Sequence, residues 1–529
     1  MSEPASTATL ANRQWMLVLG IVFPLLALIF LGQDVNWDLQ NYHLYDPFAW
    51  LHGRLHLDIA PAQIQSWHNP LLDVPMYLMA AAHWPGFVVC LWLTLPSMLT
   101  LYLLLRMQAL LGALPPDRVR TTALAVLAMG GVGFFAEIGT CLDDAFVAAG
   151  ALGSLYLVLR EEPGVDRGWV WCVAGALAGA TAGLKLTAAP YCLGLAGAAI
   201  AWPSWRRMPL RLASLALGGI AGVALTYGYW GMLLWHLHGN PFFPYYNQVF
   251  HSPDASIAAY TDARFQPASV GDALLVPLRL LAKSQRYSEM VLKDPRLLLG
   301  VVAWAVLSWR ARRVEVAGDA ARNARTRAVA GYFLVAFLAW SLQYGVYRYA
   351  IPLEMLGCLG LVLMLERLPR QRIAGGTVIA CLLAIAASYP ASWGRTHFQS
   401  TYVDVRMPPL AHGAMVVISG WSPLAFAATA LPDDVPVIGI DNTLLRPHEC
   451  GALSRQARSR IATHEGPLWL LRGGDPADDE GQRIAAVDYG LVVAGPCKPV
   501  ATSFGTLRLC PLRRDPSPST CPASPAPGR

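Results

Sequence analysis

About eleven runs of mostly apolar residues, each long enough to cross much of a lipid bilayer as a helix, constrain the fold of this chain more than any other feature. Crossing about 30 Å of hydrocarbon takes roughly twenty helical residues, or somewhat fewer when flanking side chains extend to the interface. The composition agrees, because 55% of the residues are hydrophobic and only 14% are charged, unlike those of a water-soluble domain. We therefore expect an all-α polytopic membrane bundle of about eleven transmembrane helices. The expected spans are 15–32, 85–106, 121–138, 144–160, 169–184, 187–203, 210–236, 296–310, 328–345, 350–366 and 374–389.

The arginines between these runs predict an orientation. If the chain starts in the cytoplasm and each run crosses the bilayer, every strongly basic short loop falls on the cytoplasmic side, as membrane proteins usually prefer. The first loop on the opposite side holds a single basic residue, Arg54. The apolar run 70–84 is short and carries Asp73 and Pro75, so we expect it to lie on the outer membrane surface. The net charge of +6 is thus a topology signal, and we expect no nucleic-acid partner.

The chain changes character after about residue 390, where charged residues and Gly-Gly and Pro-Asp breaks separate short runs of β-forming residues. We expect a small C-terminal α/β domain on the side opposite the cytoplasm. Its expected strands include 415–419, 435–440, 468–471 and 491–493. We predict four regions: a cytoplasmic N-terminus (1–14), a transmembrane domain (15–389), a periplasmic α/β domain (390–514) and a disordered tail (515–529). The transmembrane domain includes a first outer loop (33–84), a large outer loop (237–295) and outer juxtamembrane helices.

Two cysteines of the C-terminal domain are candidates for a disulfide bond. Cys497 and Cys510 lie close together in the sequence, and a domain outside the cytoplasm permits disulfides. The alternative is that both are free thiols.

The first outer loop contains a row of acidic residues. If the loop is helical, Asp34, Asp38, Tyr42 and Asp46 recur at every fourth position and share one face. Carboxylates flanked by aromatic side chains at the mouth of a membrane bundle could supply a catalytic base. The alternative is a solvated loop whose acids face water.

A second acidic point lies between the third and fourth runs, where Asp143 and Asp144 follow a short turn. Asp144 is placed to cap the free backbone N–H groups of the next helix, which is the structural alternative to a functional role. Lys185 and Arg348 interrupt apolar stretches, and an ionisable group near a membrane usually has a partner or a function. Phosphate is a natural ligand for such cations, whereas extension of both side chains to the outer interface is the alternative.

The loop after the seventh run contains Asn240 among prolines, histidines and aromatic residues. Prolines and aromatic rings stiffen such a loop and suit it to lie against a lipid or a sugar, while an interfacial aromatic belt is the alternative. The sequence contains no Walker loop, no dinucleotide fingerprint and no paired CxxC or HExxH spacing. These absences disfavour an ATP-driven pump and a zinc protease.

Several of these motifs, in this order, resemble the GT-C superfamily of polytopic membrane glycosyltransferases, which use polyprenyl-phosphate sugars. The resemblance covers about residues 10 to 390, and it includes the acidic first outer loop, the second acid before the fourth span and the outward C-terminal domain. The short motifs that carry it are Trp37-Asp38, Asn41-Tyr42-His43, Asn69-Pro70-Leu71-Leu72-Asp73, Gly183-Leu184-Lys185, Gly239-Asn240-Pro241 and Arg348-Tyr349.

The resemblance implies roles for individual residues. Asp38 matches the first-loop base that deprotonates the acceptor hydroxyl. Asp143 or Asp144 matches the second-loop acid, which binds a divalent cation in some members and orients the substrate in others. Lys185 and Arg348 match the cations that hold the lipid phosphate. Leu39 follows Asp38 where an Asp-Glu pair is common, which leaves Asp34 and Asp46 open as the base.

We therefore predict a glycosyltransferase of the bacterial inner membrane that moves a sugar from a polyprenyl-phosphate donor to a glycan, lipid or protein acceptor on the periplasmic face. Tyr42, His43 and Asn240 join the candidate substrate-binding residues, and a divalent cation held by Asp144 is the candidate cofactor. One alternative is a transporter or flippase of lipid-linked glycans, although transporters usually place polar groups at the bilayer midplane and show related halves. The other alternative is a non-catalytic membrane assembly protein that binds a partner through its C-terminal domain.

Overall fold

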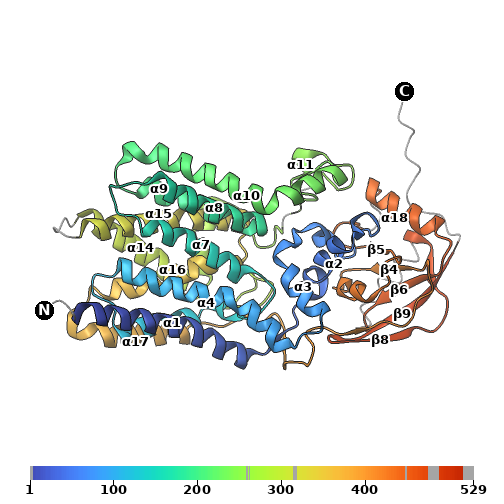
Figure 1. Ribbon diagram of the computed structural model, residues 1–529, viewed down its shortest axis with the longest axis horizontal. Coiled ribbons are helices and arrows are strands. Elements are labelled where there is room, and N and C mark those ends of the chain that lie inside the picture. Colours follow the sequence, from blue (N-terminus) through green and yellow to red (C-terminus); the bar gives the residue numbers. More distant parts are fainter. Residues whose placement is uncertain are drawn as a thin grey trace. The chain divides into compact units, whose positions relative to one another are not determined.

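The computed structural model describes residues 4–257, 260, 262–313, 319–446, 450–474 and 488–515, and Figure 1 labels its elements. The start of the predicted N-terminus and the predicted tail from residue 516 onward, with Cys521, lie outside these residues. By their packing, the residues form two compact units, each assembled from three segments of the chain. Unit 1 takes its residues from Met1–Gly32, Cys90–Gly228 and Asp262–Trp393, and unit 2 from Gln33–Val89, Tyr229–Thr261 and Gly394–Arg529.

Unit 1 is helical, and each apolar run that the sequence marks as a span contains a helix. Helices α4 and α10 contribute most of their length to this unit. Its helices are α1 (Pro4–Leu31), α4 (Gly86–Leu111), α5 (Arg118–Met129), α6 (Val132–Ala136), α7 (Asp144–Leu159), α8 (Gly168–Leu184), α9 (Ala189–Ala201), α10 (Met208–His238), α12 (Val270–Leu274), α13 (Val276–Arg279), α14 (Arg296–Arg313), α15 (Ala320–Gln343), α16 (Ile351–Leu365) and α17 (Arg370–Ala386).

Four helical stretches in the described part of the chain are long and apolar enough to cross a membrane. They are Leu10–Leu31, Gly86–Leu111, Trp205–His238 and Tyr347–Leu365. Other apolar helices are shorter, including Asp144–Leu159, Gly168–Leu184, Leu186–Ala201 and Gln371–Ala386. These helices indicate a membrane protein.

The run 121–138 forms two helices, α5 and α6, instead of one. Gly130 and Gly131 interrupt it, and a side chain at Gly131 would overlap the Glu354 carboxyl group. The backbone N–H groups of the first turn of α6 donate to Glu354, at 3.2 Å, and to Asp294, at 3.1 Å. The break is therefore stabilised by buried carboxylates that satisfy the N–H groups a helix start leaves unpaired.

Small residues bring α8 and α10 close together. A Cβ at Gly175 or Gly179 would overlap the backbone of α10, and a Cβ at Gly218 or Gly222 would overlap the backbone of α8. Glycines at such contacts allow helix backbones to approach closely, which is how helices commonly pack in membranes.

Unit 2 contains the expected C-terminal sheet, with strand order β3-β8-β9-β6-β4-β5 and β7 paired to β9. Strand β4 runs parallel to β5 and β6, and the other pairings in this sheet are antiparallel. The elements are β1 (Gln33–Asp34), α2 (Tyr45–Leu51), α3 (Val74–Ala81), α11 (Asn247–Phe250), β2 (Arg395–Thr396), β3 (Val405–Arg406), β4 (Met415–Ser419), β5 (Val437–Ile440), α18 (Ala452–Thr463), β6 (Leu468–Arg472), β7 (Leu491–Val493), β8 (Lys498–Thr502) and β9 (Gly505–Arg514).

The loop 33–84, between α1 and α4, pairs with the edge of this sheet. The backbone N–H of Ile59 donates to Val437 at 3.0 Å, and the N–H of Gly439 donates back to Ile59 at 2.7 Å, which adds a short parallel bridge beside β5. Further along the same loop, the run 70–84 forms a short turn and then α3, which has eight residues. At 1.5 Å per residue α3 is only about 12 Å long, too short to cross a bilayer.

Arg54, the single basic residue of that loop, is buried in unit 2. Its guanidinium donates two bonds of 2.9 Å to Asp58, and it also donates to the backbone carbonyls of Asp433 and Val435. Asp58 accepts further bonds from the Tyr45 hydroxyl, at 3.0 Å, and from a backbone N–H of β5. This network joins the first loop to the C-terminal sheet.

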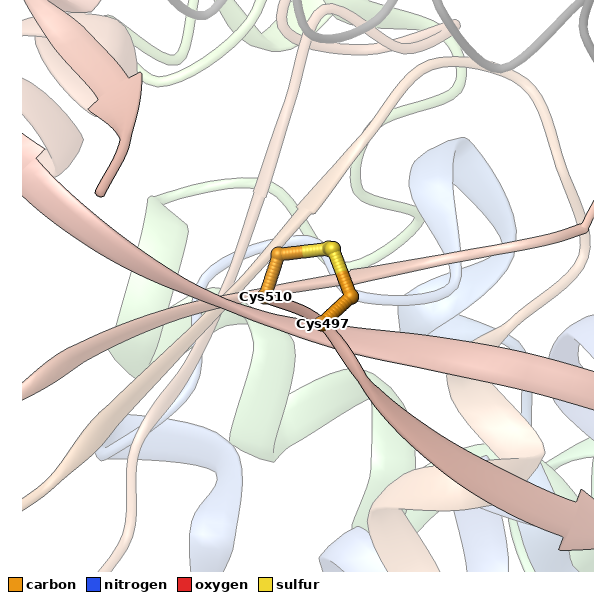
Figure 2. The surroundings of a disulfide bond; sticks show 2 residues. All are labelled: Cys497 and Cys510. Atoms are coloured by element: carbon orange, nitrogen blue, oxygen red, sulfur yellow. A yellow bond between two sulfur atoms is a disulfide. The ribbon is translucent and has the colours of Figure 1, made fainter. Parts of the chain in front are cut away.

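Cys497 and Cys510 form a disulfide bond in this sheet (Figure 2). Cys497 stands just before β8 and Cys510 lies within β9. The bond therefore links two neighbouring antiparallel strands.

Candidate functional site

Three charged residues that lie far apart in the sequence meet in unit 1. Asp144 is the first residue of α7, Lys185 follows the last residue of α8, and Arg348 lies in the turn that precedes α16. The Lys185 Nζ lies 2.7 Å from Asp144 Oδ1, and the Arg348 Nε lies 3.9 Å from Asp144 Oδ2. We call these three residues the ion-pair cluster.

A tight turn brings Asp144 to this position. Gly139 and Asp143 adopt positive φ angles of 71° and 64°, which allow the chain to reverse over the few residues between α6 and α7. Asp143 occupies the N-cap position of α7, but its side chain accepts no capping hydrogen bond. The Asp144 carboxylate instead faces the two cations.

Both cations turn inward. Lys185 also donates to the backbone carbonyl of Leu142, and its Nζ lies 5.6 Å from the centre of the Tyr349 ring. The Arg348 guanidinium lies 5.2 Å from the same ring centre and 3.4 Å from the Tyr349 hydroxyl. Their side chains are only 17% and 10% exposed, so neither extends to an interface.

Two further carboxyl groups, those of Glu137 and Glu289, lie near the ion-pair cluster. No sequence motif predicts a role for either residue. Glu137, at the end of α6, is buried and within electrostatic reach of Asp144, Lys185 and Arg348. Glu289 Oε1 lies 3.6 Å from Arg348 Nη2. Glu137 precedes the turn that carries Asp143 and Asp144. Glu289 lies in a polar loop, and no spacing in the sequence relates it to Arg348.

The charges of the cluster are compensated within unit 1. Lys185 and Arg348 face the carboxyl groups of Asp144, Glu137 and Glu289. An anionic ligand that binds both cations must therefore replace at least one carboxylate. Glu137 and Asp144 also form a pair of buried carboxyl groups whose oxygens suit a divalent cation.

In unit 2, Asp38 and its neighbours form a group of polar side chains. The Tyr42 hydroxyl lies 3.4 Å from Asp38 Oδ2, and His43 Nδ1 lies 2.8 Å from Asp73 Oδ1. His43 and Asp73 are buried, whereas Asp38 is half-buried. A carboxylate that fixes one nitrogen of a histidine orients the ring, as in many catalytic sites.

The expected row of acids on one helical face is not formed. Asp34 lies in β1, where its carboxylate accepts hydrogen bonds from the Asn36 backbone and side chain. Residues 39–43 form a wider π-helical turn, and Asp46 lies in α2. The regular spacing of four is lost because the chain passes from strand to π-helix to α-helix.

Asp46 is fully buried, and neither carboxyl oxygen has a hydrogen-bond partner among the described residues. Burial raises the pKa of Asp46 well above its ordinary value, and the nearby charge of Asp73 raises that pKa further. Of Asp34, Asp38 and Asp46, Asp38 is thus the one that solvent reaches.

Asn240 is buried and bonded within its own loop. Its side chain donates to the backbone carbonyl of Tyr245 at 2.9 Å and accepts from the N–H of Phe242 at 2.9 Å. Tyr245 in turn places its hydroxyl 2.9 Å from His68 Nε2 in the loop 33–84. Asn240 therefore shapes the loop, and the loop packs on the segment that carries Asp38.

A groove of about 420 Å³ lies elsewhere, between α5 and α17 of unit 1. It is lined mainly by apolar residues such as Val119, Val126 and Leu382. None of the candidate site residues lines it, and its walls suit a hydrocarbon chain better than a polar reaction.

The chain was compared with protein-family models, curated proteins and solved structures. No family model, curated protein or solved structure matches it.

Proposed function

We propose that this chain is a membrane glycosyltransferase that moves a sugar from a polyprenyl-phosphate-linked donor to an acceptor on the periplasmic face of a bacterial inner membrane. The observation that carries the proposal is the ion-pair cluster of Asp144, Lys185 and Arg348. It places two cations at the ends of apolar helices. A lipid-linked phosphate needs cations at such a place, because its chain stays in hydrocarbon while its charge requires partners.

The proposal includes the membrane arrangement expected from the sequence. All eleven apolar runs would cross the bilayer as a GT-C-type bundle, with the N-terminus in the cytoplasm. The long helices suffice by length, and the shorter ones would cross where flanking side chains extend to the interface.

Each residue would have one task in the reaction. Arg348 and Lys185 would hold the phosphate and stabilise the charge that it gains as leaving group. Asp38 would take the proton from the acceptor hydroxyl as that oxygen bonds to the anomeric carbon and the bond from that carbon to the phosphate breaks. Its exposure, compared with Asp34 and Asp46, supports this choice. A divalent cation, where the reaction uses one, would be held by Asp144 and Glu137 and would act as a Lewis acid.

The test is sugar transfer by the purified full-length protein in nanodiscs, with a panel of radiolabelled polyprenyl-phosphate sugars. A general base typically contributes about 10² to 10⁴ in rate, so we expect Asp38→Asn to lower turnover by that factor while donor binding is retained. Asp404→Asn is the matched control, because Asp404 is a partly exposed acid of the same unit that pairs with the exposed Arg406.

Two outcomes would support the alternatives instead. Movement of a lipid-linked glycan between leaflets without consumption of any donor would favour a flippase. Full cellular function in Asp38→Asn, together with loss of function when residues 400–514 are deleted, would favour an assembly protein.

A further inference from the structure

Glu289 is presented to Arg348 by a small hairpin in unit 1. The backbones of Ser284 and Leu292 exchange two hydrogen bonds of 3.1 Å, which close the loop that carries Glu289. The N–H of Tyr347 donates to the carbonyl of Tyr287 at 2.6 Å and ties this loop to the turn that holds Arg348. Two sets of backbone bonds thus place Glu289 beside Arg348.

The two carboxylates that form ion pairs with Arg348, those of Asp144 and Glu289, differ in how firmly they are held. Asp144 is 1% exposed and lies 2.7 Å from the Lys185 ammonium. Glu289 is 32% exposed and lies 3.6 Å from Arg348, longer than a hydrogen bond. Its Oε2 atom is buried with no hydrogen-bond partner among the described residues, as are both carboxyl oxygens of Asp144, so the comparison rests on exposure and on the contact of Asp144 with Lys185. Glu289 is therefore the weakly held carboxylate, and it has a route to solvent.

We propose that Glu289 is a displaceable gate on the phosphate site: its carboxylate occupies Arg348 until the phosphate of the lipid-linked donor replaces it. This inference rests on the proposed function. A phosphate can grip a guanidinium through two charge-assisted hydrogen bonds, whereas Glu289 makes only a longer ionic contact. A neutral lipid alcohol cannot offer such an exchange, so the gate makes occupancy of the site depend on the phosphate charge.

The test measures binding of farnesyl phosphate, with farnesol and inorganic phosphate as comparison ligands, to the full-length protein in nanodiscs. Glu289→Gln removes the competing charge, and we expect it to tighten farnesyl phosphate binding by about 1.5-fold to fivefold, the range of a partly exposed ion pair. Asp319→Asn is the matched control, because Asp319 belongs to the same unit, is 29% exposed in its pair with Arg322 and loses the same charge. In the transfer assay, the gate predicts a lower KM for the donor with little change in kcat.

Hydrogen exchange gives an independent readout. If Glu289 leaves Arg348, the amides of residues 284–292 exchange faster in wild type when farnesyl phosphate is bound, and this difference shrinks in Glu289→Gln. Binding that is equal in wild type, Glu289→Gln and Asp319→Asn, with unchanged exchange, overturns the gate and leaves the proposed function standing. Absence of farnesyl phosphate binding in all three proteins overturns both, because Arg348 is then not a phosphate ligand.

Discussion

Replacing Arg54 by methionine tests the network that joins the loop 33–84 to the C-terminal sheet. The side chains of Arg54 and Asp58 are each 1% exposed, so the substitution leaves a buried carboxylate without its cation. It also removes the donor to two backbone carbonyls. Breaking a buried pair in this way typically costs about 3–5 kcal/mol. For a unit of this size, about 1 kcal/mol shifts Tm by roughly 2–4 °C, so we expect a fall of roughly 6–20 °C.

The assay is thermal unfolding of the purified protein, followed by tryptophan fluorescence. Arg406→Met is the control, because Arg406 is 79% exposed in its pair with Asp404 and should cost less than about 1 kcal/mol. A second variant, Arg54→Met with Asp58→Leu, should recover much of the loss, since it removes the orphaned charge. The reasoning is refuted if Arg54→Met loses no more than Arg406→Met, or if the double variant is less stable than Arg54→Met.

The pH dependence of the Arg54→Met variant has a defined sign. Burial already raises the pKa of Asp58, and Arg54 is the largest influence that lowers it. Without Arg54 the folded-state pKa of Asp58 rises further above its value in the unfolded chain, about 3.9. Stability is then lost as pH rises between those two values, because the unfolded chain ionises more readily. The difference from wild type should therefore be larger at pH 8 than at pH 5.

The remaining predictions concern a buried acid and a helix contact. Because the folded-state pKa of Asp46 is raised, wild type should lose stability as pH rises from about 4 toward that pKa. The Asp46→Asn variant should lack this loss. Parallel profiles of Tm against pH for the two proteins would contradict this prediction. Gly218→Val on α10 should lower Tm strongly, because the new side chain would overlap the Cys172 carbonyl. Gly228→Val on the same helix should be nearly neutral, because a Cβ there meets nothing within 4 Å. Equal Tm values for the two variants would argue against close packing of α8 and α10.

The helices and several strands could be predicted because their signals are local. A long apolar run is enough to mark a buried helix, and short β-forming runs between breaks mark β4 to β7. The sequence predicted one span over 121–138, and the interruption at Gly130 and Gly131 was missed because the carboxylates that stabilise it come from distant segments. Bonds of that kind leave no periodic pattern to read.

The candidate site likewise contains residues that could be predicted from the sequence and residues that could not. Asp144, Lys185 and Arg348 stand out in the sequence because each is charged beside an apolar run, and the structure brings them together; their role in binding phosphate stays a prediction. Glu289 had no such signal, because its contact with Arg348 depends on a hairpin closed by backbone bonds. The pairing of Ile59 with β5 was equally hidden, since a single parallel bridge needs no alternation of side chains.

The assembly of unit 2 from three separated segments sets an order for biogenesis. The segment with Arg54 and Ile59 is made early, but its partners Val435 and Val437 come nearly four hundred residues later in the chain. At about 5–20 residues per second, the ribosome needs roughly 20–80 s to make that stretch. During this interval the Arg54 guanidinium lacks its backbone acceptors, and Ile59 lacks the partners of its bridge. Unit 2 therefore cannot complete its packing until most of the chain has been made, and truncation before β5 should leave this early segment without its partners.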